Sequence, residues 1–436
     1  MKAETQLQQR DHRVIWHPYT QHLEQPALLE VASAKGAWIT DPSGRRYLDM
    51  ISSWWVNIHG HGRGEFAEAL SDQVRLLDHV HFAGTTHETA VTLAEELLSR
   101  AGFAADDKVF FSDNGSTAVE VALKTTLQYW GNQGQERPLV IGLKGAYHGD
   151  TLGAMSAGAT CGYFDAFGKW MFEMRWLDAP YCWWEHDPLL EETAALKALD
   201  ILLEKEGGSI AAFILEPLVQ GAIGMKMYRA CFLRGIAERL KQWGIPLIAD
   251  EVMTGFGRTG SFLASQGAGV SADIVCLSKG ITGGILPFAA TLFKNHIFDK
   301  FLAEGFPKAL AHGHSYAGNP LACRVALESL RLFDKLQSLE RVRQLSGWLQ
   351  EGLRELTRNL PQIEKPRVIG AIAAFDVTTG SNRYGGSFGR QIAKLCQEKG
   401  VLIRPLGNTI YLMPPYCCTR EEVSLAFEAI KSALTE

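Results

Sequence analysis

The chain has 436 residues, which exceeds the roughly 250 to 300 residues at which a single hydrophobic core stops growing, so we expect two domains. Hydrophobic residues make up 46% of the chain and charged residues 21%, which excludes a disordered or low-complexity protein. The net charge is -5 without long runs of one sign, and this argues against nucleic acid or an anionic membrane as the main partner.

The first predicted elements are short strands, such as residues 36–41, within an N-terminal segment of residues 1–65. Six apolar, β-branched runs of strand length follow, with helices or glycine-rich loops between them. The predicted strands are residues 108–113, 138–143, 211–217, 246–251, 273–278 and 288–293, with helices at 116–130 and 228–243 and loops at 145–162 and 179–188. Buried strands that alternate with helices indicate a largely parallel sheet covered on both faces. We therefore predict an α/β domain over residues 66–325.

The C-terminal part of the chain has a different pattern. Helical spacing over residues 321–332 and 339–356 precedes three strand-like runs, which are residues 370–379, 401–406 and 409–415. Helices followed by strands predict a smaller α+β domain over residues 326–436. We expect the N-terminal segment to pack with this domain.

Two polar side chains stand at the ends of successive predicted strands. Lys279 directly follows one strand, and Asp250 ends the strand before it. Ligands gather at the carboxyl ends of strands in open α/β sheets, and a desolvated lysine can attack an aldehyde. A carboxylate at Asp250 could keep a pyridine nitrogen protonated. Taken alone, Lys279 fits a solvated strand end and Asp250 fits a loop acid. The prediction of a site therefore depends on their placement at the ends of two successive strands.

The turn DNGST at residues 113–117 is a candidate phosphate site because it joins a predicted strand to a predicted helix. Free backbone N–H groups at a helix start favour an anion, and Gly115 and Ser116 are small enough to let one approach. An ordinary helix N-cap is the alternative interpretation.

The segment GFGRTG at residues 255–260 has the spacing of a dinucleotide-binding fingerprint. That motif opens a helix and is followed about 20 residues later by an acid that ends a strand, whereas here Asp273 begins its strand. We therefore interpret the glycines as shaping a loop that carries Arg258. A nicotinamide-dependent dehydrogenase stays as the alternative from another enzyme class. The sequence has no P-loop, GxSxG elbow or HExxH helix, which argues against nucleotide hydrolysis, serine hydrolysis and zinc proteolysis.

Other candidate features are less specific. The histidine doublets lack carboxylate or thiolate companions at ligand spacing, so no metal site is predicted. These doublets are His59/His61, His79/His81 and His312/His314. Tyr19 and Trp54 can line a substrate pocket, although aromatic residues more often belong to the core. The eight cysteines form no CxxC pair, the N-terminus is polar and no apolar run approaches the ~20 residues that span a bilayer, so we expect reduced thiols in a cytoplasmic protein.

Taken in chain order, nine motifs resemble the class III pyridoxal phosphate aminotransferases of fold type I. They are HPYT, SSWW, DNGS, GAYHGDT, LIADEV, GFGRTG, LSKG, HGHSYAGNP and RPLGNTIYLMPP, and they cover nearly the whole chain. The resemblance implies pyridoxal 5'-phosphate as cofactor, a large domain with a mainly parallel sheet, and a smaller α+β domain. It also implies a homodimer in which each active site is completed across the subunit interface.

The resemblance further implies a role for individual residues. Lys279 would bind the cofactor covalently and move a proton, Asp250 would hold the pyridine nitrogen protonated, and Tyr147 would stack on the ring. The phosphate would be bound by Gly115 and Ser116, together with Ser315 from the neighbouring subunit. Arg404 would bind the substrate carboxylate through both oxygens. The remaining residues implied to line the substrate pocket are Tyr19, Trp54, Asp150, Arg258, Gly313 and Tyr411.

Within the family, HPYT, SSWW and IYLMPPY are similar to the branch that acts in biotin biosynthesis. This implies S-adenosyl-L-methionine as amino donor and 8-amino-7-oxononanoate as acceptor. HGHSY and GGILP are similar to relatives that take L-lysine as donor. Three residues depart from the expected pattern: Met253 replaces a small residue, His314 a proline and Ser315 a threonine. The alternatives are the same acceptor with L-lysine, another class III omega-amino acid aminotransferase, and an aminomutase.

Overall fold

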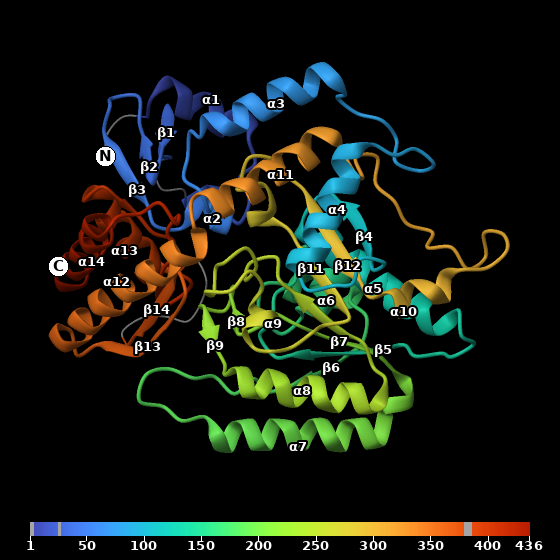
Figure 1. Ribbon diagram of the computed structural model, residues 1–436. Coiled ribbons are helices and arrows are strands. Elements are labelled where there is room, and N and C mark those ends of the chain that lie inside the picture. The colour runs from blue at the N-terminus through green and yellow to red at the C-terminus, as the bar shows by residue number, and fades with distance from the viewer. Residues whose placement is uncertain (1–3, 25–27, 379–385) are drawn as a thin grey trace.

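The computed structural model describes residues 4–24, 28–378 and 386–436, and a seven-stranded sheet forms its centre (Figure 1). The strands lie in the order β4-β12-β11-β10-β7-β5-β6. Their bounds are β4 (Lys108–Ser112), β5 (Leu139–Leu143), β6 (Met174–Leu177), β7 (Ile210–Leu215), β10 (Leu247–Asp250), β11 (Ile274–Leu277) and β12 (Ala289–Phe293). Neighbouring strands are parallel except at β12, which is antiparallel to both β4 and β11. The predicted mainly parallel sheet is confirmed.

Helices cover both faces of this sheet. On one face, α5 (Gly115–Gly131) packs against β7, β11 and β12. On the other face the core includes residues of α4 (Glu88–Arg100), α7 (Leu189–Glu206) and α8 (Ala230–Trp243). From Ala212 to Leu215, successive residues of β7 alternate between these two cores, so that Phe213 packs into one and Ile214 into the other. Burial on both faces explains why the strands are continuous apolar runs in the sequence.

The N-terminal segment pairs directly with the C-terminal part of the chain. Strands β1 (Ser33–Lys35), β2 (Trp38–Thr40) and β3 (Arg46–Asp49) are antiparallel neighbours, and β15 (Val401–Leu402) joins them parallel to β3. Figure 1 accordingly shows the blue N-terminal strands beside the red C-terminal helices. Residues from the two ends of the chain can therefore meet above the central sheet.

A second sheet lies in the C-terminal part. It is antiparallel and consists of β13 (Ile363–Ile369), β14 (Ile372–Val377) and β16 (Thr409–Leu412). Helix α12 (Ser338–Asn359) packs on β13 and β14, and α14 (Arg420–Thr435) packs on α12 and α13 (Ser387–Glu398). The predicted domain boundaries after residues 65 and 325 fall inside α3 (Gly64–Leu76) and α11 (Pro320–Lys335), and they stay a prediction.

The remaining described elements are short apart from α1. They are α1 (Gln6–Val14), α2 (Ser52–Trp55), α6 (Leu152–Ala157), α9 (Ala264–Gly267), α10 (Asn295–Phe298), β8 (Val219–Gln220), β9 (Lys226–Met227), and the 3-10 helices η1 (His22–Glu24), η2 (Asp165–Trp170), η3 (Gly207–Ser209), η4 (Lys279–Thr282) and η5 (Asp299–Phe301). None of the described helices combines the length and apolar character needed to span a bilayer.

Several elements differ from the sequence prediction, and strands β8, β9 and β13 are among those that were not predicted. The predicted loop 145–162 contains α6, which is stabilised by packing on α5 and not by its own glycine-containing sequence. The edge strand β6 was not predicted, because Arg175 interrupts its apolar pattern to pair with Glu206 at 2.6 Å. The predicted strand 401–406 is only two residues long as β15. The predicted strand 370–379 is found as β14, and residue 379 lies outside the described residues.

Candidate active site

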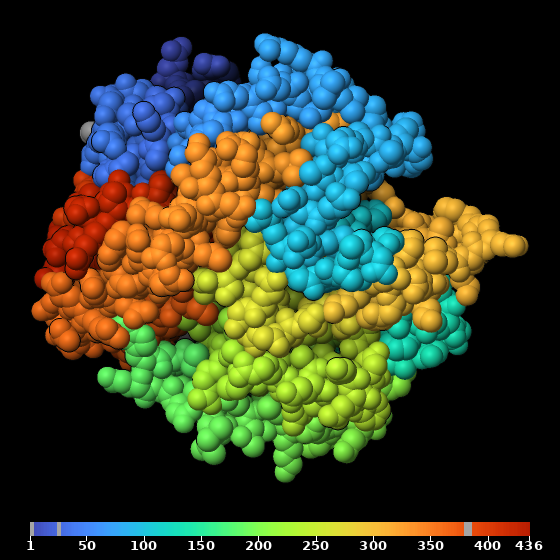
Figure 2. Space-filling view, viewed as in Figure 1, coloured from blue at the N-terminus to red at the C-terminus, as the bar shows by residue number. Residues whose placement is uncertain are grey.

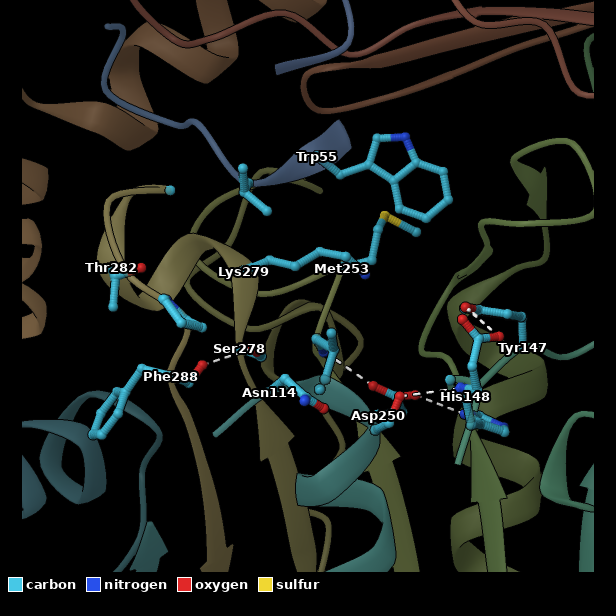
Figure 3. A pocket seen from close by; sticks show the side chains of 18 of the residues that line it. Trp55, Asn114, Tyr147, His148, Asp250, Met253, Ser278, Lys279, Thr282 and Phe288 are labelled. Atoms are coloured by element: carbon cyan, nitrogen blue, oxygen red, sulfur yellow. Dashed lines mark hydrogen bonds and ion pairs between the residues drawn. The ribbon is translucent and has the colours of Figure 1, made fainter. Parts of the chain in front are cut away.

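A cavity of about 640 Å³, here called the strand-end cavity, lies at the carboxyl ends of the central strands. Asp250 is the last residue of β10, and Lys279 follows β11 as the first residue of η4. Because β10 and β11 are parallel neighbours, both side chains reach the same cavity (Figure 3). Six residues with a predicted role in the site line it: Gly115, Ser116, Tyr147, Asp150, Asp250 and Lys279.

Lys279 has the properties of a reactive amine. Its backbone has a φ of 47°, a left-handed conformation that is unusual for a residue with a side chain. Its Nζ lies 5.0 Å from the centre of the Trp55 ring, and within the described part of the chain it makes no hydrogen bond or ion pair. Burial lowers the pKa of Lys279, against the opposing attraction of the Asp250, Glu216 and Asp150 carboxylates. The neutral, nucleophilic form is therefore favoured relative to a surface lysine.

Asp250 is held in place by two hydrogen bonds. Its Oδ2 accepts from His148 Nδ1 at 2.6 Å, and its Oδ1 accepts from the backbone N–H of Val252 at 3.1 Å. The carboxylate is 5% exposed and faces the cavity beside His148 (Figure 3). Such a fixed and buried carboxylate can accept a further hydrogen bond from a protonated ring nitrogen.

His148 and Glu216 are site residues that the sequence reasoning missed. Glu216 accepts backbone N–H groups from Tyr147 at 3.0 Å and Gly221 at 2.9 Å, and burial raises the pKa of Glu216 to about 7. It directly follows β7, as Lys279 follows β11. A carboxylate after a third buried strand is the signal that could have found Glu216, whereas nothing in the sequence pairs His148 with Asp250.

The anion cradle was predicted at residues 113–117, which the structure places at the start of α5. Asn114 caps the helix by accepting the N–H of Thr117 at 3.1 Å, so the N-cap interpretation is correct for this residue. The N–H groups of Gly115 and Ser116 belong to the first turn, where no intrahelical acceptor exists. A side chain at position 115 would place its Cβ 2.6 Å from Val252, so only glycine fits. The cradle therefore fits a phosphate group.

A second cavity of about 410 Å³, here called the aromatic cavity, adjoins the first. The two share Trp55, Val56, Tyr147, Asp150 and Lys279. Five residues predicted to contact substrate line the aromatic cavity: Tyr19, Trp54, Asp150, Arg404 and Tyr411. The Arg404 guanidinium lies 4.2 Å from the centre of the Trp54 ring. One cation at an aromatic wall, with a reactive amine where the cavities meet, suits a substrate that has an acid group and a carbonyl.

The SSWW motif reaches the cavities through an unusual turn. Residues 52–55 all have left-handed φ values, of 48°, 46°, 70° and 75°, which cost roughly 1–2 kcal/mol per residue. Ser52 Oγ donates to the carbonyl of Met413 at 2.7 Å, and Trp55 Nε1 donates to the Tyr411 hydroxyl at 2.9 Å. These bonds tie the turn to the C-terminal part of the chain and hold Trp54 and Trp55 in the cavity walls.

Asp150 connects the two cavities. Its Oδ1 accepts hydrogen bonds from the hydroxyls of Tyr19 at 2.6 Å and Tyr147 at 3.0 Å, and its backbone N–H donates to Ser116 Oγ at 3.1 Å. Burial raises the pKa of both Tyr19 and Tyr147, so the phenols stay protonated and act as donors. Gly149 has a φ of 122°, and a Cβ there would lie 2.0 Å from Ser116 Oγ. Only glycine therefore permits this close approach.

Three of the predicted site residues do not line either cavity. Arg258 is 1% exposed and donates to the carbonyls of Pro414 at 2.9 Å and Trp55 at 3.5 Å, which places it behind the Trp55 backbone. Gly313 and Ser315 belong to the segment between η5 and α11, which projects from the body at the right of Figures 1 and 2. Within one subunit these two residues are separate from the cavities.

Two further expectations concern other kinds of site. Between GFGRTG and β11, where all residues are described, the chain forms one helix, the four-residue α9, so the segment lacks the long helix that a dinucleotide fingerprint opens. Within residues 4–24, 28–378 and 386–436, no group of three or more His, Cys, Asp or Glu side chains could hold a metal ion. Met253 lines the strand-end cavity beside Lys279 and below Trp55 in Figure 3.

A doubly covered, mainly parallel sheet with a reactive lysine, a buried carboxylate and an anion cradle at its strand ends defines a pyridoxal phosphate enzyme of fold type I. The model of the aminotransferase class-III family matches residues 19–434, and the chain belongs to this family. Its cofactor is pyridoxal 5'-phosphate, and it is an aminotransferase.

Similar proteins cover nearly the whole chain. A protein of Synechococcus elongatus named adenosylmethionine-8-amino-7-oxononanoate aminotransferase is 45% identical, over 98% of this chain and 99% of that protein. A Geobacter sulfurreducens protein of the same name is 39% identical, over 98% and 97%. The crystal structure of the same-named Methanocaldococcus jannaschii protein has a TM-score of 0.89 at 33% identity and 98% coverage of both chains. An amine transaminase from an uncultivated Pseudomonas species, in its PLP-bound form, has a TM-score of 0.90 at 34% identity, covering 97% of this chain and 98% of that one.

Proposed function

We propose that this aminotransferase transfers an amino group from S-adenosyl-L-methionine to 8-amino-7-oxononanoate and so makes 7,8-diaminononanoate for biotin biosynthesis. The observation that carries the proposal is the aromatic cavity, which opens onto Lys279 and has Arg404 in its wall. The proteins at 34–45% identity that carry the name of this reaction support the same substrates.

The shape of the acceptor matches the groups in the aromatic cavity. 8-Amino-7-oxononanoate has a carboxylate at one end of a nine-carbon chain, with a ketone and an amine near the other end. In our proposal Arg404 binds the carboxylate, and the aromatic rings of Trp54 and Tyr411 cover the hydrocarbon chain. The Asp150 carboxylate is the acceptor for the amine, because it lines both cavities beside Lys279.

The strand-end cavity supplies the residues that would hold the cofactor. Gly115 and Ser116 would bind its phosphate, Asp250 its ring nitrogen, and Tyr147 would cover the ring face. When bound, pyridoxal phosphate stabilises negative charge on the substrate carbon that loses a proton. His148 would keep the Asp250 carboxylate oriented toward the ring nitrogen, since it donates to Oδ2 from the side.

Lys279 would carry the proton between substrate and cofactor. Burial lowers the pKa of Lys279, which favours the neutral amine that can accept a proton, and a protonated Lys279 is attracted by three carboxylates. Its position where the two cavities meet lets one amine serve both substrates in turn. Because the amine would be held next to the reacting atoms, the proton transfer would occur in a fixed geometry and would not need a collision with a base from solution.

The donor is proposed on the character of the cavity walls. S-adenosyl-L-methionine has a sulfonium cation and a flat adenine base, and both are attracted by aromatic faces. Tyr19 lies edge-on to Trp54 at 6.0 Å and to Tyr163 at 6.1 Å between ring centres, so three aromatic residues lie together at this wall. L-Lysine as donor stays the alternative, because its amine could pair with Asp150 in the same place.

We also propose a cytoplasmic homodimer with shared active sites. Gly313 and Ser315 line neither cavity of their own subunit, and the segment that bears them exposes three large apolar side chains. These are Leu302, Phe306 and Tyr316, which are 61%, 71% and 63% exposed. Burial of this surface against a second copy would bring Ser315 to the phosphate cradle of the partner.

A donor screen tests the proposed function. The purified protein is incubated with 8-amino-7-oxononanoate and one donor at a time, and 7,8-diaminononanoate is measured by mass spectrometry. We expect product with S-adenosyl-L-methionine and, at equal donor concentration, a rate at least about tenfold lower with L-lysine. A higher rate with L-lysine would establish the alternative donor, and no product with any donor would contradict the acceptor.

A further inference from the structure

The segment that bears Gly313 and Ser315 is fastened along one face of α5. Two α5 side chains and the residue that caps its C-terminal end, at four-residue spacing, face its backbone: Asn132 donates to the carbonyl of residue 308 at 3.1 Å, Gln128 to that of residue 309 at 2.8 Å, and Lys124 to that of residue 311 at 3.5 Å. Residues four apart lie on one face of a helix, so these donors form a single row. The row leads from the end of α5 back toward its start, where the phosphate cradle lies.

At its end nearest the cradle, this row continues through two histidines. Lys124 Nζ lies 2.9 Å from His312 Nδ1, His312 Nε2 lies 3.0 Å from His314 Nε2, and His314 Nδ1 lies 3.0 Å from Asp113 Oδ2. The order of these four groups determines which ring nitrogens carry a hydrogen and which accept one. Because a lysine ammonium can only donate, His312 Nδ1 accepts and its Nε2 carries the hydrogen. His314 Nε2 then accepts, and its Nδ1–H donates to the Asp113 carboxylate.

This arrangement requires both imidazole rings to be neutral. Protonation of His312 would place an N–H against the Lys124 ammonium, and protonation of His314 would place two N–H groups against each other. The charged groups that face the rings are Lys124 and Glu120 on α5 and Asp113 after β4. The uncharged Phe110 ring of β4 lies 5.9 Å from the His312 ring. Burial and the nearby Lys124 charge lower the pKa of His312, which keeps it neutral at neutral pH.

The last two members of this chain of hydrogen bonds, His314 and Asp113, are both next to phosphate-binding positions. Asp113 directly precedes Asn114 and Gly115 of its own cradle, and His314 directly precedes Ser315. We propose that His312 and His314 are positioning residues, which hold the segment bearing Ser315 against α5 and so make cofactor retention in the partner subunit depend on two neutral imidazoles. The inference rests on the proposed homodimer with shared active sites.

The direction of the pH effect follows from the arrangement. A histidine whose pKa is lowered when the segment is docked takes up a proton more readily when the segment is released. Acidification below the ordinary histidine range of about 6.5 therefore favours release, and the docked state is fully retained above it. The loss of one hydrogen bond to the phosphate corresponds to about a tenfold weaker cofactor affinity.

The test compares cofactor binding by the wild type, the double variant His312→Gln/His314→Gln and His314→Ala at about pH 8 and about pH 5.5, around the ordinary histidine range. Two glutamine amides can accept from Lys124, donate one to the other and donate to Asp113 in the same order as the two imidazoles, without titrating. The ratio of the wild-type dissociation constant to that of the double variant cancels the titration of the cofactor itself. We expect this ratio to be near one at the higher pH and to rise about tenfold at the lower pH, while His314→Ala binds about tenfold more weakly at both.

His296→Gln is the matched control, because His296 is half-exposed and lies 3.6 Å from Asp273 at the other end of the sheet. It should behave as the wild type. Equal affinities of all four proteins at both pH values would overturn the inference, and so would a wild type that sedimentation velocity shows to be a monomer. The readouts of this test are cofactor affinity and molecular mass. Its result can therefore be interpreted even if the donor screen gives no product.

Discussion

The strand-end cavity and the aromatic cavity meet at Lys279, but they are built in different ways. The first is formed by residues that follow strands of one sheet, all between residues 108 and 293 apart from Trp55 and Val56. The second collects Tyr19 and Trp54 from the N-terminal segment and Arg404 and Tyr411 from the C-terminal part. The chemical groups are thus fixed to a rigid sheet, whereas substrate recognition depends on segments that can vary independently of it.

The largest effect should come from the residue where the cavities meet. Lys279→Ala removes the amine that moves the proton, so turnover should fall by about 10⁴-fold with every donor. The phosphate cradle and Asp250 are unchanged, so the variant should still bind pyridoxal phosphate without a covalent link. Steady-state rates and the visible spectrum of the bound cofactor check both parts. Normal transamination by this variant would remove Lys279 from the mechanism.

A change in the strand-end cavity should affect both substrates alike. Asp250→Asn replaces a buried carboxylate that accepts a hydrogen bond from His148 at 2.6 Å, and a hydrogen bond to a charged group contributes about 1.5–3 kcal/mol. We expect each half reaction to slow by at least about 10²-fold, measured separately by stopped-flow absorbance. Asp178→Asn is the control, because Asp178 is a surface carboxylate 2.8 Å from Lys144. Slowing of only one half reaction would contradict the common role of this cavity.

A change in the aromatic cavity should instead separate the two substrates. Arg404→Ala removes the proposed carboxylate contact, so the KM for the acceptor should rise by about 10- to 100-fold with a smaller effect on kcat. Arg404→Lys should recover only part of the affinity, because an ammonium cannot bind both carboxylate oxygens in one plane. Steady-state kinetics with each substrate varied in turn measures the difference. An unchanged KM would place the carboxylate elsewhere.

The smallest effect should come from the contact between Tyr19 and Asp150. Tyr19→Phe removes a 2.6 Å hydrogen bond but leaves the ring in the cavity wall. Because Tyr147 still donates to the same oxygen, the loss should be about 0.5–1.5 kcal/mol, or roughly 2- to 12-fold in kcat/KM. A loss as large as that of Asp250→Asn would show that Tyr19 acts with the strand-end cavity in the chemistry and not only with the aromatic cavity in substrate recognition.

The central sheet was predictable because its strands are buried on both faces. Continuous apolar runs such as residues 211–217 and 246–251 mark such strands regardless of their neighbours. The same regularity put Lys279 and Asp250 at adjacent strand ends and the cradle at the start of α5. Edge strand β6 was not predicted because Arg175, which pairs with Glu206, interrupts the apolar run that a buried strand would have.

The contacts between distant segments could not be derived from the sequence pattern. The left-handed turn at residues 52–55 is held by Met413 and Tyr411, more than 350 residues away, and no local signal predicts it. Tyr19, Trp54 and Arg404 came from the family resemblance and not from periodicity or spacing. The chain of hydrogen bonds from Lys124 to Asp113 likewise depends on a loop that folds back along α5, so the doublet His312/His314 gave no hint of its partners.

Lys279 as the attachment point of the cofactor is the central feature of the proposed mechanism, and one measurement tests it directly. Borohydride reduction of the holoenzyme followed by proteolysis and mass spectrometry locates the lysine that carries pyridoxal phosphate. We expect the mass of the reduced cofactor on the peptide that contains Lys279 and loss of the visible absorbance band. A cofactor found on any other lysine, or a protein that retains its band after reduction, would contradict the account.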